Sequence, residues 1–503
     1  MKKEVNARQL ADFYIASEQN DANEARRLQR AADRNELVRI APGLYVPQAT
    51  PEEIEAKVQQ NWQKIAGALV PGAVVSHISA LSGGLSKDNV VILSHPTRFN
   101  KSITLPGVKL RLVQGPEALT GDFQVGPTGL TWSSPTRALL ENIGSVGKNN
   151  SLRLGRAKVE EHLIEMLSSQ GEAALNRIRD QSRQLAPALQ MEKEGKLLDE
   201  IIGALLGTHS RGELRTKAGI LVHQGIPLDT ERQNRFEKLA AHLRSAILPT
   251  YPDVAPMGSA KINFSFLESY FSNYVEGTKF SIEEAEDIVL RNKLVQTRPK
   301  DSHDIIGVFQ QALNTPYRDT LPATGSSFVE GLQARHAEML KNRPEAQPGE
   351  IKTDVNFAGR TRFVEPAFVR GTLQEGSTLA LSVPEGLARA IYYAFMISEV
   401  HPFVDGNGRL SRLLMNAELS RLGLCRIIIP TLFHPQYVDC ARLLTNDNEP
   451  DGFVRALAKM ATWSKQFDYS ELPALIESFE KCNAFAESPI RFQLLNKDGT
   501  TAA

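Results

Sequence analysis

The chain has 503 residues, a length that predicts three to four domains at about 150 residues each. Its 42% hydrophobic and 23% charged residues are typical of globular proteins and exclude disordered, collagen-like and coiled-coil chains. The 58 basic side chains balance the 58 acidic ones, so no overall charge attracts the chain to nucleic acid or to an anionic membrane. Three cysteines are too few for a disulfide framework, and no stretch has the roughly 18 apolar residues that cross a bilayer. Charged residues also interrupt the first twelve positions, where a signal peptide would be apolar. We therefore expect a cytoplasmic protein that does not enter a membrane.

Residues 1–48 are predicted to form a winged-helix-like module. Good helix formers fill residues 24–32, and two short extended runs flank Pro42 and Gly43. We expect two helices followed by a hairpin, which is the plan of a winged helix. Five arginines could face DNA phosphates, but residues 1–50 carry a net charge of only +1, so a solvated helix in a protein-docking module is an equal alternative. These arginines are Arg26, Arg27, Arg30, Arg34 and Arg39.

The next segment, 49–146, is predicted to be a small α/β domain. Thr50, Pro51 and Glu53 form a capping-box pattern that opens a helix reaching about Leu69. Short β-branched runs bounded by Gly, Pro and Asn then predict strands. These runs are Val74–Val75, Val90–Leu93, Ile103–Leu105 and Val108–Val113.

Three phrases in this part of the chain carry a resemblance to a known family. They read RIAPGLYV at 39–46, VSHISAL at 75–81 and SPTRALLE at 134–141. Together they resemble bacterial antitoxins of the AbiEi type over about residues 1–145, which implies a winged helix followed by a small α/β domain. His77 lies in the second phrase, but no His, Cys or carboxylate stands near it in the sequence, so we expect a structural histidine.

The middle of the chain shows helical patterns and no chemistry. Helices with polar faces are predicted over 147–250, which we interpret as a connector. A Pro- and Gly-bearing stretch at 249–258 predicts a domain boundary, so that the last large domain spans 251–485. Residues 486–503 are expected to form a frayed tail.

Residues 401–412 read HPFVDGNGRLSR and are the part of the chain that points to chemistry. Apolar residues at helical spacing precede this motif over 387–398, and Pro402 predicts that the helix stops there. The same spacing resumes at Leu410 and is expected to end at Gly423. The motif is therefore a loop that opens a helix, where backbone amides and the helix dipole favour an anion such as phosphate.

Side chains of the motif suit a reaction at a phosphate. Arg409 and Arg412 stand one helical turn apart, so both guanidinium groups can face one phosphate chain. Asp405 supplies a hard carboxylate, the kind of ligand that holds Mg²⁺ beside nucleotide phosphates. An imidazole such as that of His401 can accept a proton from an attacking hydroxyl near pH 7. Together these residues predict nucleophilic attack on a metal-bound phosphate.

At every specified position the motif resembles the signature His-Pro-Phe-x-Asp-Gly-Asn-Gly-Arg-x-x-Arg of the Fic (Fido) family, over about residues 260–470. The resemblance implies a mainly α fold with an all-α core and a β-hairpin flap. It also implies transfer of AMP from ATP, with Mg²⁺, to a Ser, Thr or Tyr hydroxyl of a target protein or of the chain itself, with release of pyrophosphate. By position, the resemblance makes His401 the general base and Asp405 the Mg²⁺ ligand. The residues that it assigns to the nucleotide phosphates are Gly406, Asn407, Gly408, Arg409 and Arg412.

Two further segments resemble parts of this family. Residues 359–366 look like its flap, which pairs with the target peptide by strand addition and includes Thr361, Arg362, Phe363 and Val364. The inhibitory helix of the family reads Ser or Thr, three residues, Glu, then Gly or Asn, a pattern that occurs at 272–277 and again at 326–331. We assign the inhibitory role to Glu276 with Ser272, in a helix near 262–277, and keep Glu330 as the alternative. A carboxylate paired with Arg412 would take the place of phosphate charge.

Other functions stay open at this stage. Relatives with the same core use another nucleotide, transfer phosphate, or remove AMP from modified proteins. A different class is a DNA-binding transcriptional or toxin–antitoxin regulator, in which residues 1–48 bind DNA and the Fic domain is a nucleotide switch. Tyr437 either stacks on adenine or belongs to the core. The target protein and a homo-oligomeric state also stay open.

Overall fold

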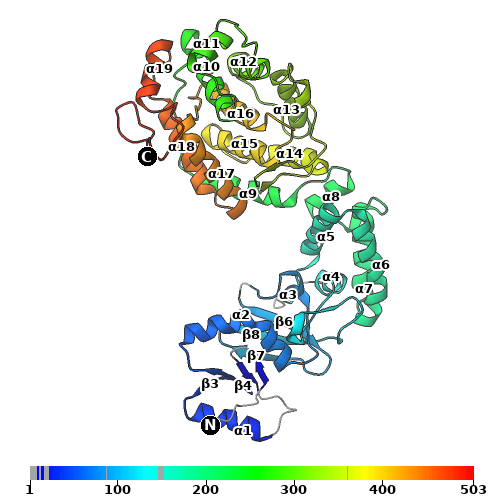
Figure 1. The fold of residues 1–503 in the computed structure, drawn as a ribbon. Helices are drawn as coiled ribbons and strands as arrows, with labels where there is room; N and C mark the ends of the chain where they lie inside the picture. Colours follow the sequence, from blue (N-terminus) through cyan, green and yellow to red (C-terminus); the bar gives the residue numbers. More distant parts are fainter. Residues whose placement is uncertain are drawn as a thin grey trace. The chain divides into compact units, whose positions relative to one another are not determined.

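A computed structural model describes residues 8–10, 13–15, 22–86, 88–145, 152–359 and 361–502 of the chain. These residues form two compact units, one within residues 1–224 and one within 225–503 (Figure 1). Helices predominate in the described residues, and the predicted mainly α fold is confirmed. None of the described helices is both long and apolar enough to cross a membrane.

The first unit begins with a small antiparallel sheet. Phe13 and Ile15 are buried whereas Tyr14 between them is partly exposed, and this two-residue period is that of a strand. The prediction of two helices before the hairpin is therefore wrong for residues 8–10 and 13–15, which are strands. One helix, α1 (Ala22–Asp33), follows them. The strand order in the sheet is β1 (Arg8–Leu10), β2 (Phe13–Ile15), β4 (Leu44–Pro47), β3 (Leu37–Ala41).

A mixed six-stranded sheet follows in the same unit, and the four predicted β-branched runs are strands of it. Helix α2 (Pro51–Leu69) opens with the predicted capping box, in which Thr50 and Glu53 exchange hydrogen bonds between side chain and backbone. Val58 of α2 shares a buried core with Leu110 of the sheet. The strand order is β7 (Lys101–Leu105), β8 (Val108–Gln114), β6 (Val90–His95), β5 (Val74–Val75), β10 (Thr131–Trp132), β9 (Phe123–Gln124).

Helices complete the first unit, as predicted for the middle of the chain. His77 starts the short helix α3 (His77–Leu81) and donates its backbone N–H to Glu141. Burial lowers the pKa of His77, which fits a neutral histidine inside the fold. The other helices are η1 (Gly126–Thr128), α4 (Pro135–Ile143), α5 (Arg156–Gln170), α6 (Glu172–Leu189), α7 (Glu192–Leu205), η2 (Arg211–Glu213) and α8 (Lys217–His223).

The second unit is a helical domain built around α15 (Leu387–Val400) and α16 (Asn407–Arg421), which lie at its centre in Figure 1. Both helices are buried along most of their length. A hairpin of β11 (Phe357–Ala358) and β12 (Thr361–Arg362) interrupts the helices. The remaining elements are α9 (Thr230–Ser245), α10 (Gly258–Tyr274), α11 (Ile282–Val289), α12 (Pro299–Leu313), α13 (Ser326–Met339), η3 (Pro344–Ala346), α14 (Pro366–Ala380), η4 (Thr431–Phe433), α17 (His434–Asp447), α18 (Pro450–Ser464) and α19 (Leu472–Lys481).

The second unit begins before the predicted boundary near residue 250. Phe236 and Leu239 of α9 are fully buried in the same core as Tyr392 and Phe395 of α15. The connector predicted over 147–250 is therefore wrong from residue 225 onward, because α9 belongs to the helical domain. The stretch at 249–258 joins two helices of one core.

The C-terminal residues are also ordered by contacts, contrary to the predicted frayed tail. Leu494 is buried, and the indole N–H of Trp463 donates to the carbonyl of Leu495. Glu487 accepts hydrogen bonds from the hydroxyl of Tyr274 and from the ammonium of Lys279. The tail therefore packs on the helical domain and contacts residues on both sides of Glu276.

Candidate active site

The first half of the motif, 401–406, forms a tight loop between α15 and α16, and residues 407–412 form the first turns of α16. His401 ends α15 in a left-handed conformation with φ of 53°, and Gly406 precedes α16 with φ of 77°. The Asn407 side chain closes the loop, since its oxygen accepts the N–H of Phe403 at 2.9 Å and its amide donates to the Phe403 carbonyl at 2.8 Å. The predicted helix end and helix start are both confirmed, and the loop brings His401 next to the N-terminus of α16.

His401 is held as a neutral imidazole with one free nitrogen. Its Nδ1 lies 3.2 Å from the carbonyl of Ser398, and because a carbonyl only accepts, Nδ1 carries the proton. Burial lowers the pKa of His401 to about 4, so the ring is uncharged at neutral pH. The Phe363 ring stacks on the imidazole at 3.9 Å between centroids and 9° between planes. Nε2 is therefore the nitrogen that can accept a proton.

Arg409 is fixed by two carboxylates. Its guanidinium forms ion pairs with Asp304 of α12 at 2.6 Å and with Asp405 at 2.9 Å, and its side chain is almost completely buried. Asp304 also binds Arg343, which lies 3.6 Å from Asp405. Two arginines and two carboxylates thus set the orientation of Arg409 before any ligand binds.

Asp405 has the properties that a Mg²⁺ ligand needs. Its side chain is 44% exposed, and the N–H of Gly406 donates to it at 2.6 Å. Burial would raise the pKa of Asp405, but Arg409 and the Gly406 amide outweigh this effect and lower it, so the group is ionised. Among the described residues no cluster of three or more His, Cys, Asp or Glu could hold a metal alone. A single carboxylate fits Mg²⁺, which usually keeps waters and shares its ligands with substrate phosphates.

Arg412 is engaged by residues of the α10 end. Its Nη2 donates to Glu276 at 2.7 Å and to the backbone carbonyl of Ser272 at 2.9 Å, and its Nε donates to the Ser272 hydroxyl at 2.9 Å. The Glu276 carboxylate also lies against Gly408, where a Cβ would stand only 2.1 Å from its oxygen. Burial would raise the pKa of Glu276, but Arg412 outweighs it and keeps the pKa below the usual value. A carboxylate therefore occupies the anion-binding start of α16.

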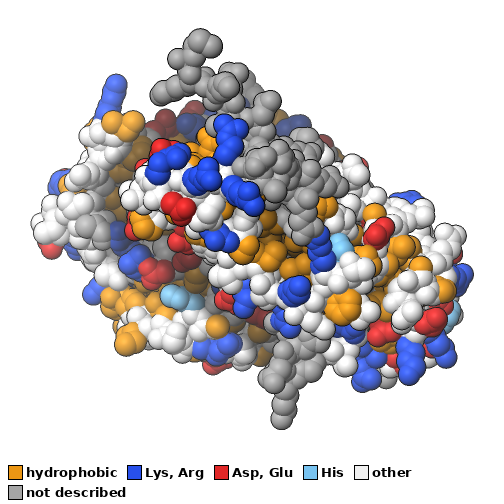
Figure 2. Space-filling view, turned by 90° about the horizontal axis from the view of Figure 1, so that it is seen from below, with side chains coloured by type: hydrophobic (Ala, Val, Ile, Leu, Met, Phe, Trp, Pro, Cys, Tyr) orange, Lys and Arg blue, Asp and Glu red, His pale blue; other side chains and the backbone are white. Residues whose placement is uncertain are grey.

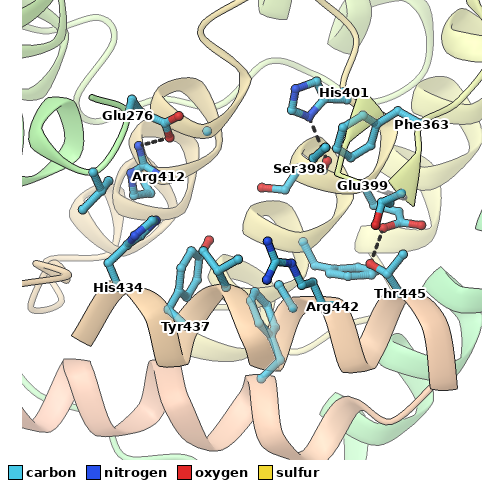
Figure 3. Close-up of a pocket in the computed structure, with 18 residues that line it drawn as sticks. Glu276, Phe363, Ser398, Glu399, His401, Arg412, His434, Tyr437, Arg442 and Thr445 are labelled. Atoms are coloured by element: carbon cyan, nitrogen blue, oxygen red, sulfur yellow. Dashed lines mark hydrogen bonds and ion pairs between the residues drawn. The ribbon is translucent and has the colours of Figure 1, made fainter. Parts of the chain in front are cut away.

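His401, Glu276 and Arg412 line one pocket of about 280 Å³, whereas Arg409 and Asp405 are not among its lining residues. Figure 3 shows Glu276 and Arg412 on one side of it and His401 with Phe363 on the other. His434 stands beside Arg412, and burial together with this arginine lowers its pKa to about 4. The remaining part of the pocket combines an apolar wall with a few polar groups, the usual character of a small-molecule site. Its apolar residues include Phe395, Tyr437, Val438, Ala441 and Phe453, and its polar ones include Ser398, Glu399, Arg442 and Thr445.

The other predicted site residues are placed around this pocket or away from it. Thr361 lines the pocket, whereas Arg362 is exposed and pairs with Glu365. Val364 is completely buried, so it is a core residue rather than part of an exposed flap edge. Glu330 is exposed on α13 and does not line the pocket.

Two residues of the site escape sequence reasoning. Asp304 lies about a hundred positions before Arg409, and Lys352 lies about fifty before His401, in segments without a local chemical pattern. Lys352 is 2% exposed and lies close enough to His401 to lower its pKa. The only sequence signals are a polar residue on the apolar face of a helix for Asp304 and a lysine near the flap for Lys352.

The fold and the loop define a helical domain whose central helix presents an anion-binding N-terminus beside a neutral histidine. Residues 328–419 match the model of the Fic/DOC family, so this part of the chain is a Fic/DOC domain.

Curated relatives match over part of their length. Protein adenylyltransferase fic-1 of Caenorhabditis elegans is 27% identical over 209 residues, which are 40% of this chain and 40% of that protein. Protein adenylyltransferase Fic of Drosophila mojavensis is 24% identical over 258 residues, 48% of this chain and 50% of that protein. The chain thus spans half or less of the length of these relatives. A solved structure of residues 134–508 of C. elegans Fic-1 shares 18% identity, covers 65% of this chain and 93% of that chain, and gives a TM-score of 0.35.

Proposed function

We propose that this chain is an autoinhibited protein adenylyltransferase. It moves AMP from ATP, bound with Mg²⁺, to a Ser, Thr or Tyr hydroxyl of a target protein or of its own chain, and releases pyrophosphate. The observation that carries the proposal is the pocket that holds neutral His401, the start of α16 and Arg412 together, with Glu276 on that arginine. The names of the curated relatives support the same activity.

His401 acts as the general base in this proposal. The hydroxyl oxygen forms a bond to the α-phosphorus while the bond from that phosphorus to the bridging oxygen of pyrophosphate breaks. The hydroxyl proton passes to Nε2 of His401, which is free because Nδ1 donates to Ser398. The low pKa of His401, about 4, keeps this nitrogen unprotonated at neutral pH.

The start of α16 binds the phosphates. The amides of Asn407 and Gly408 and the guanidinium groups of Arg409 and Arg412 supply donors for phosphoryl oxygens, while the Gly406 amide donates to Asp405. Asp405 would hold Mg²⁺, which supplies neutralisation of the phosphate charge. Arg409 is already oriented by Asp304, whereas Arg412 becomes available only when Glu276 leaves it.

The test compares label from two positions of ATP on a variant released from inhibition. With Glu276→Gly, label from the α-phosphate should remain on protein and label from the γ-phosphate should not. His401→Ala in the same background should lower the rate at least about 100-fold, the lower range for loss of a general base. His162→Ala, at a partly exposed histidine of the first unit, is the matched control and should change nothing.

Other outcomes identify the alternative reactions. Label from the γ-phosphate alone would show phosphate transfer and overturn AMP transfer. Stronger competition by another nucleoside triphosphate than by unlabelled ATP would change the assigned substrate. Loss of AMP from modified protein, without gain of label, would show the reverse hydrolytic activity.

A second candidate function is DNA binding by the first unit. Helix α1 exposes Arg26, Arg27 and Arg30, which share one face at this spacing. Figure 2 shows a few Lys and Arg side chains close together on the face seen from below, with acidic and hydrophobic side chains among and around them. A gel shift across salt concentrations tests this function. The logarithm of the affinity falls as the logarithm of the salt concentration rises, and each phosphate contact makes this fall steeper by about 0.9. Replacing the three arginines by alanine should lower the affinity and make its dependence on salt less steep. Arg455 is an exposed arginine of α18, and Arg455→Ala should change neither quantity.

A further inference from the structure

Lys352 is a buried ammonium group that pairs with no carboxylate among the described residues. Its side chain donates to the amide oxygen of Asn356 at 2.6 Å and reaches the carbonyl of Val400 at 3.5 Å. The residue is 2% exposed, and burial lowers its pKa to about 8. A buried charge whose hydrogen-bond acceptors are neutral is unfavourable for stability. A role in the site therefore explains this lysine better than a contribution to stability does.

Hydrogen bonds connect Lys352 with both the motif loop and the flap. Its backbone N–H donates to the carbonyl of Pro402 at 3.0 Å. The side-chain amide of Asn356 donates to the carbonyl of Phe403 at 3.0 Å, and the backbone carbonyl of Asn356 accepts the N–H of Phe363 at 3.2 Å. Lys352 and Asn356 thus fasten the flap to the loop that carries His401.

Phe363 brings this connection to the imidazole. Its ring stacks on His401 at 3.9 Å, and the ammonium of Lys352 lies 6.0 Å from the centroid of the same ring. Phe363 is thus a contact shared by Lys352 and His401, and the positive charge of Lys352 disfavours a second positive charge on the imidazole.

Several other charges face His401 and Lys352. Burial is the main influence on the pKa of His401 and lowers it, the hydrogen bond to Ser398 raises it, Lys352 lowers it, and Glu276 and Asp405 raise it. Arg412 and His434 line the same pocket. Glu365 favours the charged form of Lys352 and Arg232 opposes it. A bound triphosphate would add negative charge and push the pKa of His401 upward. Lys352 is the cation placed to oppose that effect.

We propose that Lys352 is a positioning residue that keeps His401 in its proton-accepting form and fixes it against the flap. This inference rests on the proposed role of His401 as the base. Lys352 touches neither hydroxyl nor phosphate in this proposal and acts through His401, Asn356 and Phe363.

The test is the protonation of His401 in full-length protein, followed by NMR with ¹³C-labelled histidine and assigned with His401→Ala. Lys352→Met removes the charge at similar volume and should raise the pKa of His401 by about half a unit or more. Lys352→Arg retains the charge and should keep the wild-type value. Lys341→Met, at an exposed lysine that pairs with Glu338, is the control for loss of a distant charge.

The pH dependence of AMP transfer provides the second measurement, with all variants in the Glu276→Gly background. Only the unprotonated form of His401 is active as a base. A higher pKa of His401 in Lys352→Met should therefore move the acid limb of kcat/KM to higher pH by the same amount. In Lys352→Arg the acid limb should stay at the wild-type position. If Lys352→Met does not fold, Asn356→Asp replaces it, because a carboxylate beside the ammonium cancels its field and should shift the limb in the same direction.

Two outcomes overturn the inference. An unchanged NMR titration of His401 in folded Lys352→Met would show that the lysine is only structural, as would equal loss of rate at every pH. A complete absence of AMP transfer in the Glu276→Gly background would contradict the proposed function instead, and the NMR titration would still decide the role of Lys352.

Discussion

The pattern Ser, three residues, Glu, Gly occurs at 272–277 and at 326–331, and the two copies have different surroundings. In the first copy Ser272 lies in the last turn of α10, and Glu276 follows the helix end in a turn that closes at Gly277 with φ of 96°. In the second copy all six residues lie within α13, and Glu330 is exposed. Only the first glutamate reaches an arginine of the motif loop.

The glycines that end the two copies, Gly277 and Gly331, also have different surroundings. A Cβ at Gly277 would meet open space, so this glycine serves the left-handed turn. A Cβ at Gly331 would stand 2.5 Å from Cβ of Pro322, so this glycine serves close packing of α13. The comparison teaches that a helix end, rather than the spacing of serine and glutamate, delivers the carboxylate to Arg412.

The largest expected difference is between removal of Glu276 and removal of Glu330. Glu276→Gly frees Arg412 for phosphate and should raise the initial rate of labelling from α-labelled ATP at least about tenfold, a coupling of about 1.4 kcal/mol. Glu330→Gly should leave the rate within about twofold. A rise in Glu330→Gly with no change in Glu276→Gly would reverse the assignment.

Much of this contrast could not be predicted from the sequence. Helical spacing and the stops at Pro402 and Gly423 predict α15 and α16 well, because their signals are local. The residues of the motif 401–412 are contiguous, so their common site was predictable. The sequence favours Glu276 over Glu330, but contact with Arg412 depends on the packing of α10, which the short pattern does not report.

The predictions that were wrong or missing concern residues whose structure depends on tertiary contacts. Residues 13–15 form a strand because tertiary packing buries Phe13 and Ile15, and the sequence hides this alternation because Tyr14 between them is also hydrophobic. Helix α9 has a largely polar composition, but its few apolar residues belong to the core of the second unit. Asp304 and Lys352 reach the site through the fold across long separations, which no local pattern reports.

Gly331→Ala should separate packing from inhibition. The added methyl group collides with Pro322, and overpacking of this kind costs about 1–3 kcal/mol. The melting temperature of the second unit should fall by about 2–4 °C for each kcal/mol, while labelling per folded molecule stays constant.

Gly277→Ala strains the left-handed turn that holds Glu276 and should raise labelling instead. Equal activation by the two variants would argue against distinct roles for the two glycines.

Ser272→Ala should have a smaller effect than loss of Glu276. It removes the hydroxyl that accepts from Nε of Arg412 but leaves the Glu276 ion pair and the Ser272 carbonyl in place. One such hydrogen bond contributes about 1 kcal/mol, so labelling should rise up to about fivefold. Ser326→Ala, at the corresponding position of the second copy, should leave labelling unchanged. If Ser272→Ala activates as strongly as Glu276→Gly, the serine rather than the carboxylate holds Arg412.

The smallest expected effect is that of mild acid on the inhibition. Arg412 keeps the pKa of Glu276 below its usual value, so the ion pair is present at neutral pH and is lost only as the pH falls through that lowered pKa. The ratio of rates between Glu276→Gly and wild type should therefore stay constant within about twofold from pH 7 to pH 5, measured with α-labelled ATP. The ratio for Glu330→Gly should stay near one over the same range. A collapse of the first ratio toward one at pH 5 would mean that burial raises the pKa of Glu276 above its ordinary value, which the short contact with Arg412 opposes.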